Sequence, residues 1–148
     1  MYDPIMVQPM REEATEIGFR ELLTPDEVKN ELSKDGTTFV FVNSVCGCAA
    51  GKARPGLSLA VEWAKNNNAM PDNLVTVFAG MEKDAVNEAR TFFTGVPPSS
   101  PQMALLKNGE LIHMINRMDI ENNDANTVAN LVAGIFNKYC KKEKAENA

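Results

Sequence analysis

Two of the three cysteines in this sequence, Cys46 and Cys48, are separated only by Gly47. Thiols this close in the chain cannot crosslink distant parts of a fold, so the pair points to thiol–disulfide chemistry. The thiolate is the reactive form of cysteine, and a helix N-terminus favours it through free amides and the helix dipole. The pair follows an apolar segment and precedes a predicted helix, so we expect Cys46 to be the nucleophile and Cys48 the resolving thiol.

The residues around the pair suggest further roles. Gly47 carries no side chain, so the backbone can turn tightly there and a substrate sulfur can come close. Lys52 and Arg54 add positive charge within the next two helical turns. We expect both to be solvated helix charges and Arg54 to be a candidate for holding an anionic thiol substrate. A disulfide between residues this close is constrained, which favours a labile, oxidising pair.

A zinc site is the main chemical alternative, because Cys46, Cys48, Cys140 and His113 are all zinc-binding residue types. Paired zinc cysteines, however, are usually separated by about two to four residues. His113 lies in an alternating strand pattern and is expected to be a structural or surface histidine. Cys140 follows the exposed end of an apolar stripe and is expected to be a spectator, with a third redox thiol or an intermolecular pairing site as alternatives.

The elements that must position this pair form an alternating pattern. Residues 37–43 are β-branched and aromatic with a continuously apolar core, and residues 74–79 show the same pattern, which is typical of strands buried between helices in a parallel sheet. Between them, Leu57, Val61 and Ala64 form the apolar stripe of a helix. Together these segments predict a β-α-β unit with the cysteine pair directly after its first strand.

Helices are predicted at both ends of the chain. Residues 10–19 suggest one amphipathic helix, and Thr24 with Glu27 forms a capping box that begins another, which runs to about residue 34. A further helix is expected over 83–93, and an apolar stripe from Val128 to Tyr139 predicts the last one.

Asn108-Gly109 lies between two apolar runs and is a strong hairpin signal. The predicted order is therefore β-α-β-α-β-β-α after two additional N-terminal helices, an α/β fold with a mixed central sheet flanked by helices. We expect one domain over 1–148, with an N-terminal helical extension over 1–36 and a polar tail over 141–148.

Composition excludes several classes of function. The chain of 148 residues is 44% hydrophobic and 24% charged, which fits one globular domain. A net charge of −5 argues against a nucleic-acid-binding surface. The sequence has no run of about 18 apolar residues and no secretory signal at its start, so we expect a cytoplasmic protein with no membrane partner.

Proline placement suggests a second part of the site. Pro101 begins a predicted strand, where a cis Ser100–Pro101 bond would be a specific feature. Residues 101–109 resemble the thioredoxin stretch of cis proline, apolar strand and Lys-Asn-Gly turn, and Pro55 resembles the proline of thioredoxin's active-site helix. In thioredoxins the cis proline lies beside the active cysteine, so the resemblance implies that Ser100 and Pro101 contact substrate.

A more specific resemblance covers nearly the whole chain. Residues 43–51, continuing through 53–56, and the opening residues 2–4 with 7–13 are similar to the signature of the bacilliredoxins. The resemblance implies a thioredoxin-like fold and removal of bacillithiol from mixed disulfides on other proteins, with Cys46 attacking and Cys48 resolving. Val45, where thioredoxin has tryptophan, and the one-residue gap both argue against thioredoxin-like reduction of large protein disulfides.

The expected partners follow from the same resemblance. They are S-bacillithiolated proteins, bacillithiol as thiol co-substrate and a bacillithiol disulfide reductase, with no nucleic acid, metal or other cofactor. The expected substrate-binding residues are Pro101, Ser100, Gly47 and Arg54. Two alternatives stay open: a protein disulfide isomerase or oxidase using the same cysteines, and a non-catalytic thioredoxin-fold binding module.

Overall fold

A computed structural model of the chain describes residues 1–142. Its elements, in chain order, are α1 (Pro4–Thr15), β1 (Arg20–Glu21), α2 (Pro25–Leu32), β2 (Thr37–Asn43), the π-helical turn η1 (Ala49–Ala53), α3 (Arg54–Asn66), β3 (Asn73–Phe78), α4 (Lys83–Arg90), β4 (Gln102–Lys107), β5 (Glu110–Ile115), α5 (Arg117–Glu121) and α6 (Ala125–Tyr139).

The strands form one mixed sheet in the order β1-β3-β2-β4-β5. β3 is parallel to both of its neighbours, and β2–β4 and β4–β5 are antiparallel. All seven residues of the central strand β2 are buried. The predicted α/β fold with a mixed central sheet is therefore confirmed, and the end of its central strand leads directly to Cys46.

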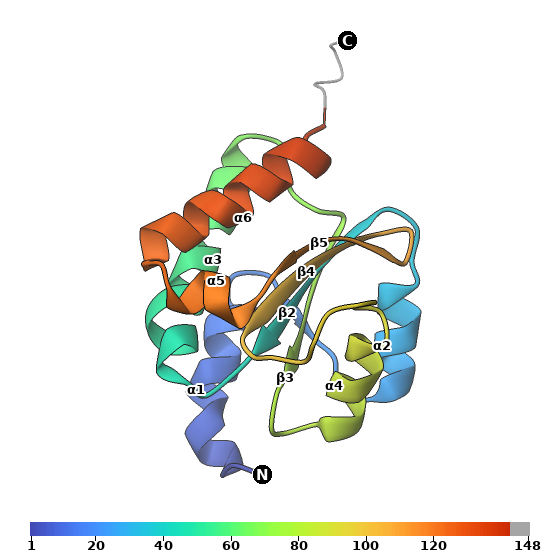
Figure 1. Cartoon of the computed structure of the whole chain (residues 1–148), viewed down its shortest axis with the longest axis vertical. Coiled ribbons are helices and arrows are strands. Elements are labelled where there is room, and N and C mark those ends of the chain that lie inside the picture. The colour runs from blue at the N-terminus through green and yellow to red at the C-terminus, as the bar shows by residue number, and fades with distance from the viewer. Residues whose placement is uncertain (143–148) are drawn as a thin grey trace.

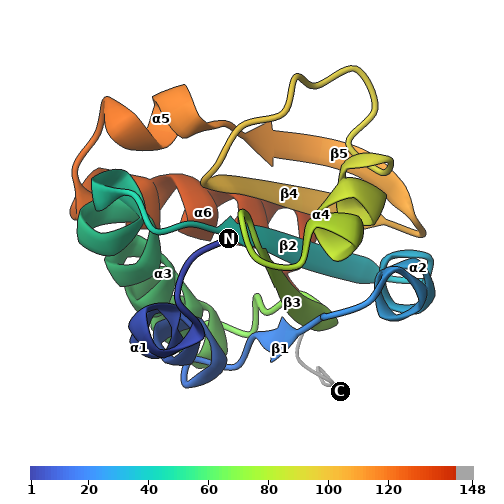
Figure 2. The ribbon, with the colours of Figure 1, turned by 90° about the horizontal axis from the view of Figure 1, so that it is seen from below.

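Helices cover both faces of the sheet (Figures 1 and 2). Because strand side chains alternate between faces, Phe39 and Phe41 pack in a core with α3 and α6, whereas Val40 and Val42 pack with α2 and α4. A small third cluster joins α1 to the carboxyl ends of β2 and β3 and includes Val7, Phe78, Met81, Met10 and Val45.

Local signals account for several element boundaries. The capping box at Thr24 is formed, since its hydroxyl accepts from Glu27 N and the Glu27 carboxylate accepts from Thr24 N. The hairpin turn between β4 and β5 places Asn108 and Gly109 at φ values of 52° and 83°, as an Asn-Gly turn requires.

Three parts of the N-terminal and C-terminal regions differ from expectation. The first helix spans Pro4–Thr15 rather than 10–19, because Asp3 caps it by accepting from Ile5 N and Gly18, at φ 110°, lies just beyond its end. The segment expected to be purely helical also contributes β1, whose two residues pair with β3. The five-residue helix α5 has no counterpart in the prediction.

Two further observations concern the ends of the chain and its helices. Of the tail expected over 141–148, residues 143–148 lie outside the part of the chain that is described. Over residues 1–142, no helix is both long enough and apolar enough to span a membrane.

Candidate active site

The cysteine pair lies in the short connection between β2 and η1, at the carboxyl end of the central strand. The sulfurs of Cys46 and Cys48 are 3.1 Å apart, and both cysteines are free thiols whose side chains are half-buried. The backbone carbonyl of Cys46 accepts from the amides of Ala49 and Ala50, which begins the helical segment that follows. The pair therefore occupies the strand-to-helix position expected from the sequence.

The two thiols differ in acidity. Burial by itself raises the pKa of Cys46, but hydrogen bonds from the Cys48 thiol, the Ala49 amide, the Ser44 hydroxyl and the Cys48 amide bring the pKa below its ordinary value. Burial raises the pKa of Cys48, and its hydrogen bond to Cys46 and the Cys46 charge raise it further. Cys46 therefore ionises first, and Cys48 keeps its proton and donates a hydrogen bond to the Cys46 thiolate, which supports the predicted division of roles.

The segment after the pair is a π turn rather than the regular helix expected. In η1 the amide of Arg54 donates to the carbonyl of Ala49, five residues earlier. Pro55 has no amide hydrogen, and its ring would crowd the carbonyl of Gly51 in a regular α-helix, so the wider turn accommodates it. Such π turns occur frequently at functional sites.

Arg54 is not the solvated helix charge expected from the sequence. Its side chain is only 4% exposed. Its Nε donates to Glu13 Oε1 at 2.6 Å, and its Nη1 donates to Asn43 Oδ1 and to the carbonyl of Ser44 at 3.0 and 2.9 Å. The guanidinium therefore fixes the loop before Cys46 to α1, and the prediction of a solvated charge is wrong because these buried acceptors engage it.

The remaining residues of the motif are more accessible. Gly47 is exposed, and a Cβ added there would meet no atom within 4 Å. Its φ lies outside the left-handed region, so the turn does not require glycine, contrary to expectation, although the open space beside the thiols is present. Lys52 is half-buried, and its ammonium donates to the carbonyl of Glu121 at the end of α5.

Ser100 and Pro101 lie at the same end of the sheet as the cysteines. The Ser100–Pro101 bond is cis, as expected. In the antiparallel pairing of β2 with β4, Val42 is opposite Gln102, so the preceding Pro101 lies beside the end of β2. Pro101 is buried and Ser100 is half-buried.

Arg117, the first residue of α5, is a site residue that the sequence analysis missed. Its Nη1 donates to the carbonyl of Ser100 at 3.2 Å. The pKa of Arg117 is raised, first by its hydrogen bond to Glu121 and then by the nearby Cys48 and Cys46 thiolates. This arginine thus bonds α5 to the proline segment. Only the Asn116-x-x-Asp119 capping pattern could have indicated the helix that carries it.

Ser44 was also missed. Its Oγ accepts from the amide of Cys46 at 3.3 Å, and its own amide donates to Asn43 Oδ1 at 2.8 Å. The hydroxyl thus stabilises both the loop and the Cys46 thiolate, and a serine two residues before a reactive cysteine is too common to have been distinctive.

The other residues considered from the sequence lie apart from the pair. His113 is exposed on β5. Cys140 is 4% exposed, not at an exposed end as expected, because the chain after α6 turns back and Lys142 N donates to the carbonyl of Asn68. Burial raises the pKa of Cys140, which disfavours its thiolate. Over residues 1–142, the structure brings together no group of three His, Cys, Asp or Glu side chains that could hold a metal ion.

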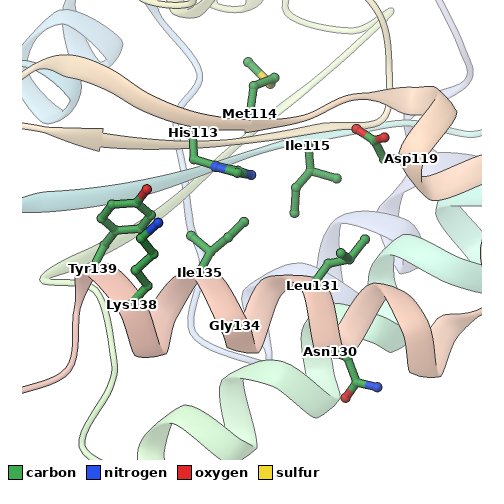
Figure 3. Close-up of a pocket in the computed structure, with 10 residues that line it drawn as sticks. All are labelled: His113, Met114, Ile115, Asp119, Asn130, Leu131, Gly134, Ile135, Lys138 and Tyr139. Atoms are coloured by element: carbon green, nitrogen blue, oxygen red, sulfur yellow. The ribbon is translucent and has the colours of Figure 1, made fainter.

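Two of the cavities in the described part of the chain involve β5 or the segments on either side of α5. One, of about 400 Å³, lies between β5 and α6, where His113 and Ile115 face Leu131 and Ile135 (Figure 3). Neither Cys46 nor Cys48 lines it. The second, of about 390 Å³, is bounded by the proline segment and the start of α5, including Arg117.

Solved structures with the same fold include thioredoxins. The oxidised thioredoxin of Plasmodium falciparum superposes with a TM-score of 0.55 at 18% identity, covering 83% of this chain and 99% of that one. The thioredoxin of Malassezia sympodialis superposes with a TM-score of 0.58 at 10% identity, covering 83% and 91%. At these identities the similarity establishes the thioredoxin fold alone.

Sequence comparison gives the family. The profile of the family described as "Disulphide isomerase" matches residues 2–140. A bacilliredoxin of Geobacillus kaustophilus is 52% identical over 136 residues, covering 91% of this chain and 92% of that protein. A bacilliredoxin of Koribacter versatilis is 48% identical over 141 residues, covering 95% and 94%. With its cysteine pair at the end of the central strand of a thioredoxin fold, the chain is a thiol oxidoreductase that belongs to the bacilliredoxin family.

Proposed function

We propose that this protein removes bacillithiol from mixed disulfides on other proteins, through Cys46 and Cys48. The observation that carries the proposal is the unequal thiol pair, with the pKa of Cys46 lowered and that of Cys48 raised at a sulfur separation of 3.1 Å. The family name of the relatives supports bacillithiol as the thiol involved. We also propose a cytoplasmic location, since the chemistry needs reduced thiols.

The first step is an exchange of one disulfide for another. The Cys46 thiolate attacks the bacillithiol sulfur, the target protein leaves as a thiolate that takes up a proton, and Cys46 becomes S-bacillithiolated. The open space at Gly47 leaves room for the incoming disulfide. No net oxidation or reduction occurs in this step, because one S–S bond forms as another breaks.

The second step removes bacillithiol from Cys46, and it leaves the enzyme either with a Cys46–Cys48 disulfide or with a free Cys46 thiol. Cys48, after losing its proton, can attack the Cys46 sulfur, release bacillithiol and leave a Cys46–Cys48 disulfide. Alternatively, free bacillithiol attacks the bacillithiol sulfur of the adduct and leaves as bacillithiol disulfide, which regenerates the Cys46 thiol. A bacillithiol disulfide reductase would then return bacillithiol to its reduced form.

The proposal is tested with a protein substrate carrying one bacillithiol, followed by mass spectrometry of substrate and enzyme. C46A should lose all removal of bacillithiol, whereas C48A should complete the first step and accumulate the adduct on Cys46. C140A is the matched control, because Cys140 is buried in the core and should leave the rate unchanged. If C48A blocked the first step while C46A did not, the assigned roles would be reversed.

A protein disulfide isomerase activity is the second candidate, and the description of the matching family favours it. It would use the same Cys46 thiolate on a disulfide within one unfolded chain. The two activities are separated by comparing kcat/KM on a bacillithiolated protein with kcat/KM on a scrambled disulfide substrate. Full biological activity in a variant lacking both Cys46 and Cys48 would instead indicate a binding module.

A further inference from the structure

Arg117 presents a cation at the end of the sheet where the cysteine pair lies, because it bonds to Ser100, next to the end of β2. Its side chain is 44% exposed, its Nη1 donates to the carbonyl of Ser100, and its Nε lies 3.3 Å from Glu121 Oε1. Within residues 1–142, Nη2 donates to no acceptor. An arginine with one open edge can donate charge-assisted hydrogen bonds to a carboxylate.

The other cations close to the pair are committed elsewhere. Arg54 is buried and donates to Glu13, Asn43 and Ser44. The Lys52 ammonium donates to a backbone carbonyl. Of these three cations, Arg117 is therefore the one available to an incoming ligand.

Arg117 also lines the cavity of about 390 Å³ that is bounded by the proline segment and the start of α5, here called the proline cleft; Cys46 and Cys48 are not among its lining residues. Its walls are Pro97, Pro98, Ser99, Asn116, Arg117, Met118 and Asp119. Gln102, which is fully buried, holds the two walls together by donating from Nε2 to the carbonyl of Pro97 and to Asn116 Oδ1. The cleft is thus a formed site rather than a gap between loose segments.

Two carboxylates near the cleft set its charge balance. Asp119 Oδ2 accepts from the amide of Asn116, so this group is used in capping α5. Glu121 pairs with Arg117 through an exposed contact, which is weak because water screens it. A ligand carboxylate would compete with Glu121 for the guanidinium.

We propose that Arg117 and the proline cleft bind a carboxylate of the low-molecular-weight thiol whose sulfur Cys46 attacks. The inference rests on the proposed function, because bacillithiol carries carboxylates. It assigns the anion-binding role to Arg117 in place of Arg54, whose guanidinium is buried and bonded within the protein. The preference for an anionic adduct over a neutral one is then set by this arginine.

The test compares two adducts of the same substrate protein, one with bacillithiol and one with the neutral thiol 2-mercaptoethanol. In R117A the ratio of kcat/KM for the bacillithiol adduct to kcat/KM for the neutral adduct should fall about tenfold, the low end for a hydrogen bond to a charged group. R117K should retain part of the ratio, and E121Q should raise it by removing the competing carboxylate. K107A is the matched control, since Lys107 is exposed and pairs with the opposite end of β2.

A second measurement does not depend on bacillithiol. Alkylation of Cys46 by iodoacetate and by the neutral iodoacetamide is compared in C48A/C140A and in the same protein with R117A, at a pH where Cys46 is fully ionised. The iodoacetate-to-iodoacetamide ratio should fall several-fold with R117A. An equal fall with both adducts and both reagents would overturn the inference, because Arg117 would then act only on the reactivity of the thiol.

The two proposals fail in different ways. If the wild-type enzyme does not remove bacillithiol, the proposed function is wrong and the alkylation ratio alone decides the role of Arg117. If it removes bacillithiol and R117A leaves the adduct ratio unchanged, the function stands and the inference about Arg117 is wrong.

Discussion

At the scale of single residues, the activity of the pair depends on one shared hydrogen bond. The Cys48 thiol donates to Cys46, which stabilises the Cys46 thiolate and raises the pKa of Cys48. The lowered pKa of Cys46 and the raised pKa of Cys48 therefore arise within the pair itself, without a charged residue bonded to the nucleophile. Ser44 adds a second donor to the same sulfur.

C48A should raise the pKa of Cys46, because the charged form loses a hydrogen bond that the protonated form does not need. Below that pKa, alkylation of Cys46 by iodoacetamide should then slow by roughly three- to tenfold, the effect of losing a hydrogen bond of about 1 kcal/mol. The pH dependence of alkylation should shift to higher pH. C48S keeps a hydroxyl donor and should shift less, and equal profiles for C48A and wild type would exclude this role of Cys48.

The predictability of the site also differs from residue to residue. Cys46 and Cys48 were identified from type and spacing, because a Cys-Gly-Cys segment after a buried strand has few structural roles. Arg54 was misjudged because its burial depends on Glu13, a residue distant in sequence that α1 brings to it. Arg117 was missed because its relevance depends on a chain reversal after β5 that no local pattern specifies.

At the scale of elements, strong local patterns predicted the fold well. β2 spans the predicted residues 37–43, and the capping box and the Asn-Gly turn lie where expected. β1 and α5 were not predicted, since elements of two and five residues are too short to show a period. The π turn was not predicted, since the proline that it accommodates, Pro55, is equally compatible with the first turn of a regular helix.

The helix that carries the site packs closely on α6 through Gly56. A Cβ at this position would lie 2.8 Å from Val128 Cγ1 and 3.1 Å from the carbonyl of Ala125, and the carbonyl cannot rotate away. G56A should therefore lower the free energy of unfolding by about 1–3 kcal/mol, as overpacking does. Urea unfolding followed by circular dichroism measures this change.

Gly134 in α6 provides the control for that substitution. A Cβ there would meet nothing within 4 Å, so G134A should raise the free energy of unfolding by up to about 1 kcal/mol through helix propensity. The same change from glycine to alanine should therefore lower the free energy of unfolding in G56A and raise it in G134A. A stability for G56A equal to or above wild type would show that α3 and α6 are less closely packed than described.

At the scale of the whole molecule, α1 acts as a support for the cysteine loop. The carbonyl of Met10 accepts from Asn43 Nδ2, and Glu13 accepts from Arg54, so one helix holds both ends of the loop network. Val45 of the loop packs in the cluster that contains Val7 and Phe78. α1 lies alongside α3, to the left of the sheet in Figure 2, far in sequence from the cysteines that it supports.

Arg11 fixes this helix to the rest of the protein, and R11A should release it. The Arg11 guanidinium is 11% exposed, pairs with Glu21 at 2.6 Å and Glu82 at 2.8 Å, and lies 5.3 Å from the ring centre of Phe78. Its removal leaves two partly buried carboxylates without their cation, so unfolding should require about 2 kcal/mol less. Hydrogen exchange should accelerate in α1 more than in β2.

The control is K34A, which removes only an exposed partner of Glu31 and should change the free energy of unfolding by less than about 0.5 kcal/mol. Equal effects of R11A and K34A would mean that apolar packing alone holds α1 in place.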